Sequence, residues 1–233
     1  MKTLTIRLAG PLQSYGNEAT FARRTSGDYP SKSAVVGMLA AALGYRRADP
    51  RIAALNELAF AVRIDQPGRV LTEFQTIEWK KGTRKLSYRD LLQDAVFVAA
   101  VGSDDDELIA SLAAALKHPR FQLFLGRRAN VPAGVLKCET FVDRDPIEAL
   151  HDLPWQAADW YQHRLAGKAE VRVDVYADAH LLPKAEAAVR VAKDRVESFD
   201  QRDRRFSFRT VKHASVTFDN SAMQTEHDIW ANL

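Results

Sequence analysis

The sequence has only one cysteine among its 233 residues, Cys138. A single thiol excludes an internal disulfide framework, and no Cys/His spacing along the chain suggests structural zinc. No stretch reaches the roughly 18 consecutive apolar residues that a membrane-spanning helix needs. The first ten residues alternate charged or polar and apolar side chains, so they lack the apolar core of a signal peptide. We therefore expect a soluble, cytoplasmic protein without membrane association, and no feature points to a metal or another cofactor.

The sequence also lacks a large excess of one charge, because it has 33 Lys and Arg residues and 30 Asp and Glu residues, for a net charge of +3. A balance this mild is weak evidence for nucleic-acid binding, so the grouping of the cations matters more than their number. Apolar residues, in contrast, are plentiful at 46%. The chain is therefore long and apolar enough to bury a sizeable core, as one large domain or two small ones.

Residues 21–47 join a basic, glycine-bearing loop to an apolar helix. Apolar residues recur at helical spacing from Val35 to Leu43 before Gly44, either Asp28 or Ser31 can cap the start, and Pro30 suits the first turn. A helix start offers unpaired N–H groups and a partial positive charge, which favour phosphate. The candidate anion ligands here are Arg23, Arg24, Ser31, Lys32 and Ser33. An ordinary capped helix with solvated charges fits this segment equally well.

Residues 79–89 contain five cations, two aromatics and no acid, which favours a projecting basic hairpin near residues 76–90. Cations can follow the phosphates of a single strand while a ring stacks on a base for roughly 1–3 kcal/mol. The alternative is a solvated turn between two strands. The candidate RNA-binding residues of the hairpin are Lys80, Lys81, Arg84, Lys85 and Arg89.

The pattern up to residue 143 predicts the order strand, helix, strand, strand, helix, strand, which fits a ferredoxin-like, or RRM-like, α+β domain. Ser103 and the acids after it are interpreted as the start of the second long helix rather than a metal site. The expected strands are 3–9, 60–64, 69–79, 95–101, 121–128 and 135–142, with a short helix at 51–58. The strand at 121–128 would deliver Arg127 and Arg128 into a loop, where they could grip phosphate or a neighbouring subunit.

Residues 144–233 are expected to form a smaller β-rich part. A helical turn at 147–150, an irregular aromatic segment at 154–167 and a strand at 171–175 precede residues 183–196, which read as a helix or a mobile connection. A last strand at 202–218 would place Phe206 and Phe208 on one side and Arg205 and Arg209 on the other. The remaining tail, from residue 219, has no clear pattern and is expected to be flexible.

Three motifs carry a resemblance to a known family: RLAGPLQSYG near the start, TSGDYPSKSAVVGMLAAALG, and FQLFLGRRANVP. In order and spacing they resemble the CasD family of type I-E CRISPR systems, within the repeat-associated RAMP superfamily. The resemblance implies a ferredoxin-like domain with a basic thumb hairpin and a non-catalytic role in the Cascade surveillance complex. It further implies that the protein holds the 5′ handle of the CRISPR RNA (crRNA) and caps the backbone filament, in contact with CasC-like and CasA-like subunits.

Two alternatives stay open. A metal-independent endoribonuclease that processes the repeat RNA would need an acid, a base and a cation around the reacting phosphate. Its candidate residues are Tyr45, Tyr88, His118 and His213, with Lys117 and Lys212 as charge stabilisers. The second alternative is a structural assembly protein that meets RNA only in passing.

Overall fold

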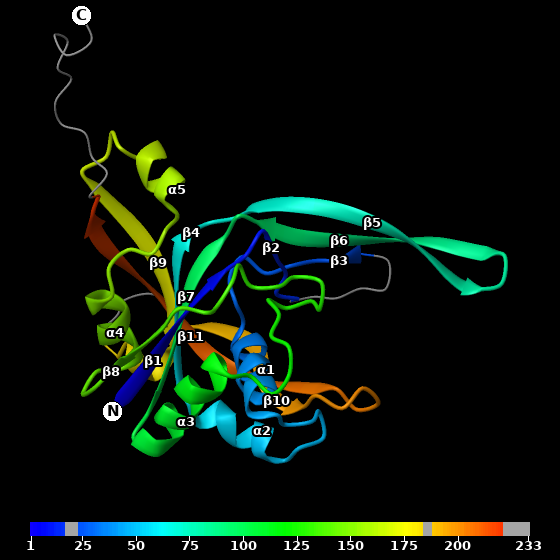
Figure 1. The fold of residues 1–233 in the computed structure, drawn as a ribbon, viewed down its shortest axis with the longest axis horizontal. Helices are drawn as coiled ribbons and strands as arrows, with labels where there is room; N and C mark the ends of the chain where they lie inside the picture. Colours follow the sequence, from blue (N-terminus) through cyan, green and yellow to red (C-terminus); the bar gives the residue numbers. More distant parts are fainter. Residues whose placement is uncertain (17–22, 184–187, 221–233) are drawn as a thin grey trace, which may run out of the picture.

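The computed structural model describes residues 1–16, 23–183 and 188–220. It is a mixed α/β structure dominated by strands (Figure 1). The strands are β1 (Lys2–Ala9), β2 (Leu12–Gln13), β3 (Arg23–Arg24), β4 (Ala59–Gln66), β5 (Arg69–Lys80), β6 (Thr83–Gln93), β7 (Val96–Ser103), β8 (Cys138–Phe141), β9 (Glu170–Asp178), β10 (Arg190–Ser198) and β11 (Arg205–Asp219). The α-helices are α1 (Lys32–Leu43), α2 (Arg51–Ala54), α3 (Asp106–Lys117), α4 (Pro146–Asp152) and α5 (Asp159–Arg164), and two 3₁₀ turns, η1 (Leu55–Glu57) and η2 (Ala179–Leu181), complete the set.

Seven strands form the central sheet, in the order β10-β11-β9-β4-β7-β1-β8, and every neighbouring pair is antiparallel. The predicted strands 3–9, 60–64 and 95–101 are confirmed as β1, β4 and β7. The strand expected at 135–142 is shorter, because β8 has only four residues. Strands from after residue 143 extend the same sheet through β9, and the division into two domains at that residue stays a prediction.

Helices cover both faces of this sheet. Helices α1 and α3 pack on one face, where their apolar residues join Ile6, Phe60 and Phe97 in the main core. Helix α4 covers the other face, where Leu150 packs with Val98. Strand β7 is therefore buried on both sides, which its continuous apolar sequence predicted. The helices of the described ranges are at most 12 residues long, and none is long and apolar enough to cross a membrane.

The predicted signals at the helix ends were largely correct. Ser31 caps α1, its Oγ accepting the N–H of Ala34 at 3.3 Å, and Gly44 ends the helix in the left-handed conformation with φ of 81°. Pro30 precedes the cap instead of lying in the first turn. The cap of α3 is Asp105 rather than Ser103, because the Asp105 carboxylate accepts two backbone N–H groups of the first turn.

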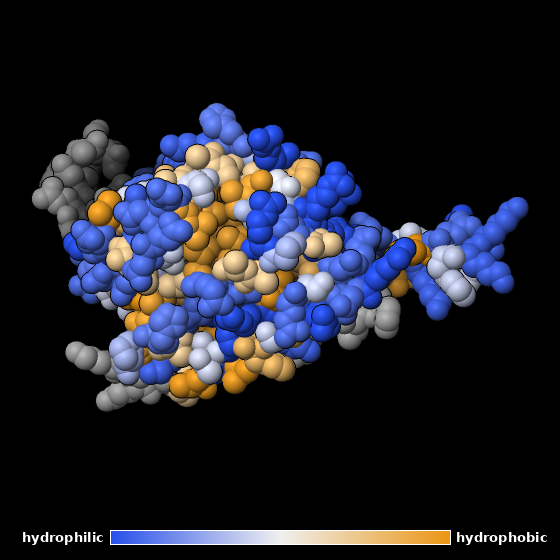
Figure 2. All heavy atoms as spheres, turned by 90° about the horizontal axis from the view of Figure 1, so that it is seen from below, coloured by the Kyte–Doolittle hydropathy of each residue, from blue (hydrophilic) through white to orange (hydrophobic). Residues whose placement is uncertain are grey.

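Strands β5 and β6 form a long hairpin that projects from the body (Figure 1). It spans residues 69–93 and turns at Gly82, with φ of 78°, so it is longer than the expected 76–90. At its base β6 also pairs with β2 and, in parallel, with β3. The projecting arm presents a mostly hydrophilic surface in Figure 2.

Residues 121–128 do not form the predicted strand. Leu123 and Leu125 are both buried, which gives the alternation typical of a strand, but the backbone does not form the hydrogen bonds of a sheet. The N–H of Phe121 donates to the carbonyl of Ala41 in α1, and the Leu125 carbonyl accepts the N–H of Ser14. The segment is therefore an irregular strap across the end of α1.

The C-terminal part differs from its prediction in three places. Residues 190–198 are strand β10, not a helix, and residues 184–187 lie outside the described part. On β11, Phe206 packs against Phe199 and the main core, whereas Phe208 is 63% exposed and the Arg209 side chain is buried, so the phenylalanines and arginines do not divide into a buried and an exposed set. The expected tail begins within β11, and residues 221–233 lie outside the described ranges.

Candidate nucleic-acid interface

A groove of about 850 Å³ runs between α1 and the strap formed by residues 121–128. Among the residues that the structure describes, the charged lining consists of arginines, with no aspartate, glutamate or lysine. These arginines are Arg46, Arg47, Arg128 and Arg204. Guanidinium groups without neighbouring carboxylates favour an anion, and their planar N–H pairs match the oxygens of a phosphate.

The same groove offers rings and hydroxyl groups. Tyr45, Phe124 and Phe199 line it, and Ser31 and Ser33 contribute from the start of α1. Aromatic rings beside cations suit a single-stranded nucleic acid, because bases stack on the rings while phosphates meet the cations. The groove therefore has the chemistry to hold a short segment of RNA backbone with its bases.

Gly126 fixes the strap against the body. Its φ is +87°, and a Cβ placed there would lie 1.6 Å from the carbonyl oxygen of Ser14. Glycine alone permits this approach, which carries the chain into the turn where Arg127 and Arg128 follow. The close backbone approach at Gly126 is thus made to the protein itself.

The start of α1 is already occupied by the protein's own carboxylates. The N–H of Lys32 donates to Oδ2 of Asp194 at 2.7 Å, and the Lys32 ammonium lies 3.0 Å from Oδ2 of Asp178. Arg209 binds both carboxylates at 2.7 to 3.0 Å. Burial lowers the pKa of Lys32, and the charge of Asp178 opposes that effect.

Lys32 was expected to meet phosphate at an open helix end, and the structure contradicts this. Only 5% of the residue is exposed and its ammonium is paired inside the protein. Ser31 uses its hydroxyl as the helix cap and still lines the groove, as Ser33 does. We therefore keep the two serines as candidates and leave Lys32 out.

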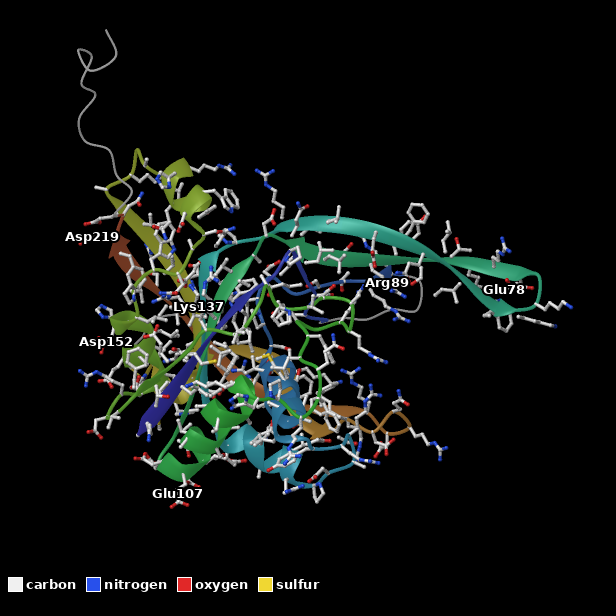
Figure 3. All side chains as sticks on the ribbon, viewed as in Figure 1. Glu78, Arg89, Glu107, Lys137, Asp152 and Asp219 are labelled. Carbon is white, nitrogen blue, oxygen red and sulfur yellow. The ribbon has the colours of Figure 1, made fainter. Side chains whose placement is uncertain are left out.

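A second basic region lies at the base of the hairpin. Strand β3 places Arg23 and Arg24 beside Tyr88 and Arg89 of β6. Arg127 reaches this region from the strap, and its Nη2 donates to the carbonyl of Arg24 at 3.4 Å. Burial lowers the pKa of Arg127, and the nearby positive charge of Arg89 lowers it further. Four arginines from three separate segments of the sequence thus come together. Figure 3 shows where Arg89 lies on the hairpin.

The tip of the hairpin carries the other predicted cations, which are Lys80, Lys81, Arg84 and Lys85, all exposed. Arg84 lies 3.6 Å from Glu78, a residue just before the acid-free stretch. The Lys85 ammonium lies 5.4 Å from the centre of the Trp79 ring, so cation and ring are already adjacent. Because the tip projects away from the body, these residues do not line the groove (Figure 3).

Three groove arginines were missed by the sequence interpretation. Arg46 and Arg47 follow Gly44 at the end of α1, and Arg204 precedes β11. The adjacent pair after the helix was a visible signal. Arg204 also belongs to an adjacent pair, with Arg205, but its contact with the groove depends on how β11 joins the sheet.

The candidate nuclease groups are distributed over separate elements. Tyr45 lies in the groove with the Arg51 guanidinium over its ring, whereas Tyr88 is on the hairpin, His118 follows α3 beside Lys117, and His213 is on β11. His213 binds Asp174 at 2.7 Å.

The Lys212–His213 pair is not arranged as a reaction centre. Lys212 donates to the carbonyl of Leu182, and as neighbours on a strand Lys212 and His213 point to opposite faces. Within the described ranges, no three His, Cys, Asp or Glu side chains are grouped closely enough to hold a metal ion.

Comparisons with known proteins agree with one another. A family model described as CRISPR-associated protein (Cas_Cas5) matches residues 3–217. The CRISPR system Cascade subunit CasD of Escherichia coli strain K12 is 32% identical over 167 residues, which cover 63% of this chain and 75% of that protein.

Two solved structures are similar over nearly the whole chain. One, described as a CRISPR RNA-guided surveillance complex, has a TM-score of 0.73 and 30% identity, covering 99% of this chain and 96% of its own. The other, a crystal structure of a Cas protein, has a TM-score of 0.70 and 31% identity, covering 95% and 97%. The motifs, the fold and the family match lead to one conclusion: this chain belongs to the Cas5 family of CRISPR-associated proteins.

Proposed function

We propose that the protein is a non-catalytic RNA-binding subunit of a type I-E Cascade complex, which holds the 5′ handle of the crRNA in antiviral defence. The observation that carries this proposal is the groove between α1 and the strap, where the charged residues of the described lining are four arginines. Such a lining favours a polyanion, and the rings beside it favour one that has bases.

We further propose that residues up to about 143 act as a ferredoxin-like domain with the β5/β6 hairpin as its thumb. The order β4-β7-β1-β8, with two helices on one face, supports this assignment. The basic tip and the arginines at the base support a path for RNA along the hairpin. In this arrangement Arg23, Arg24, Arg89 and Arg127 contact phosphates near the base, while Ser31, Ser33 and Arg128 act in the groove.

The partners we propose are the crRNA, a CasC-like backbone subunit and a CasA-like large subunit, assembled in the cytoplasm. The similarity to a Cascade subunit and to a protein of an RNA-guided surveillance complex supports this. A capping role at one end of the backbone filament follows from the same similarity.

The nuclease alternative receives less support from the geometry. Its candidate groups lie on different elements, and His213 is engaged with Asp174. The assembly-only alternative does not explain why four arginines gather in the lining of one groove.

The experiment is to incubate the full-length protein, without metal, with its host's repeat RNA and with an unrelated RNA of equal length, and to follow retention and cleavage over a salt series. We expect retention that falls steeply with salt and favours the repeat RNA, without cleavage. Cleavage at one repeat position, abolished by His118→Ala or His213→Ala, would make this a processing nuclease. If neither RNA is retained, the result would contradict RNA binding and favour the structural assembly protein.

A further inference from the structure

Three buried polar side-chain atoms have no hydrogen-bond partner within the described part of the chain: Oγ of Ser87, Nε of Arg89 and Nη1 of Arg127. A buried donor without an acceptor is costly, by about 1–3 kcal/mol for a neutral group and more for a charged one. Native proteins keep few such groups, and each requires an explanation. That all three lie in one region indicates a missing acceptor there.

The hairpin register brings these atoms together. Ser87 and Arg89 are two residues apart on β6, so their side chains project from the same face. Glu73 pairs directly with Arg89 across the hairpin, and Arg127 approaches the same face from the strap. Two arginines therefore flank the Glu73 carboxylate, and Ser87 lies two residues from Arg89 on the same face of β6.

Glu73 offsets part of the positive charge of Arg89 and Arg127, but it accepts no hydrogen bond from their unpaired N–H groups. Its Oε1 lies 3.9 Å from Nη1 of Arg89 and 3.9 Å from Nη1 of Arg127, beyond hydrogen-bond distance in both cases. A second carboxylate, Asp90, also acts on Arg127, but it is paired with Arg23, and Arg24 adds another positive charge, so the arginines still outnumber the carboxylates. The site is therefore short of both an acceptor and a negative charge, and an RNA phosphate supplies the two together.

We propose that Ser87, Arg89 and Arg127 form a discrete subsite for one backbone phosphate of single-stranded RNA, with Glu73 as the resident carboxylate that the phosphate displaces. This proposal rests on the proposed RNA-binding function. Its new part is that Glu73 competes with the phosphate and so weakens RNA binding. Glu73 keeps the two arginines close together in the free protein, and its displacement costs part of the energy gained from the phosphate. Affinity is thereby held below what the arginines alone would give.

The test compares Glu73→Gln with Glu107→Gln, which removes the same charge from the exposed start of α3, far from the hairpin (Figure 3). Affinity for the repeat RNA is measured by fluorescence anisotropy over a salt series. We expect Glu73→Gln to bind about three- to tenfold more tightly, with a salt slope steeper by up to about one, because one charge no longer competes with the phosphate. Glu107→Gln should change affinity less than twofold, and the gain from Glu73→Gln should vanish when Arg127→Ala is added.

Weaker binding by Glu73→Gln would show that Glu73 supports the arginines and does not compete, which would overturn the proposal. Equal effects of Glu73→Gln and Glu107→Gln, including no effect of either, would overturn it too. Equal effects are also what we expect if this face binds a carboxylate of a partner protein instead of an RNA phosphate. A wild-type protein that retains no RNA would instead refute the proposed function, so the two failures are distinguishable.

A second variant, Ser87→Ala, separates a ligand site from a packing defect. Removal of an unpaired buried hydroxyl should raise the Tm of the free protein by a few degrees. The same change should weaken RNA binding by about threefold or more, because the phosphate loses a donor. A higher Tm with unchanged RNA affinity would show that Ser87 does not bind the phosphate, and it would overturn the proposed three-residue subsite.

Discussion

The Oδ2 atom of Asp194, on β10, lies 2.7 Å from the backbone nitrogen of Lys32, the first residue of α1. A carboxylate from the C-terminal strands thus occupies the helix end that the sequence offers to phosphate. The same carboxylate binds Arg209, and Asp178 completes a buried group of two positive and two negative charges. This network ties the start of α1, and with it one wall of the groove, to strands β9, β10 and β11.

Breaking this network should be costly. We expect Asp194→Asn to lower the free energy of unfolding by about 3 kcal/mol, because Lys32 and Arg209 would then share the single carboxylate of Asp178 inside the protein. Urea denaturation measures the effect. The control is Glu57→Gln, which removes the exposed partner of Arg195 and should cost no more than about 1 kcal/mol. If both changes cost the same small amount, the buried network does not hold α1 in place.

Gly126 and Gly134 provide a matched pair for the strap. Both have a positive φ, of 87° and 82°, but only at Gly126 would a Cβ meet another atom, the Ser14 carbonyl oxygen at 1.6 Å. We expect Gly134→Ala to cost about 1 kcal/mol of backbone strain. Gly126→Ala should cost at least about 3 kcal/mol and weaken RNA binding, because the strap must move away from the body.

Thermal unfolding and RNA titration of the two glycine variants give the comparison. An equal loss of stability in both would mean that the contact of Gly126 with Ser14 does not shape the groove.

Cys138 should react slowly with thiol reagents in the folded protein. Burial raises the pKa of its thiol to about 11 from the ordinary 9.0. At pH 8 the thiolate is therefore scarcer by about a hundredfold, and we expect labelling by a chromogenic disulfide to be slowed at least that much relative to the urea-unfolded chain.

The same shift has a consequence for stability. Because the folded pKa is the higher one, the contribution of this thiol is complete below pH 9.0 and is lost as the pH rises towards about 11. Labelling of the native protein as fast as of the unfolded chain would contradict the burial of Cys138.

Local signals predicted the elements whose ends are set by neighbouring residues. Ser31 and Gly44 bound α1 because capping and the left-handed conformation depend on a few adjacent positions. The uninterrupted apolar sequence of β7 likewise predicted a strand buried on both faces.

Long-range pairing explains the misses. Leu123 and Leu125 alternate as in a strand, yet the backbone of this segment bonds elsewhere: Phe121 donates to α1, and Leu125 bonds to Ser14 and Asn130. Residues 183–196 read as a helix or a mobile connection, because the strand character of β10 depends on pairing with β11. Lys32 looked accessible, since nothing near it in sequence announces Asp178 and Asp194.

The most direct test of the central claim, that the arginine groove holds crRNA, is a salt titration of RNA binding by Arg128→Ala with Arg204→Ala. The control is Arg144→Ala with Arg172→Ala, two exposed arginines outside the groove. We expect the groove variant to bind the repeat RNA about 10- to 100-fold more weakly and to lose about two units of salt slope, with the control close to wild type. Equal affinity and slope in the two variants would contradict the claim.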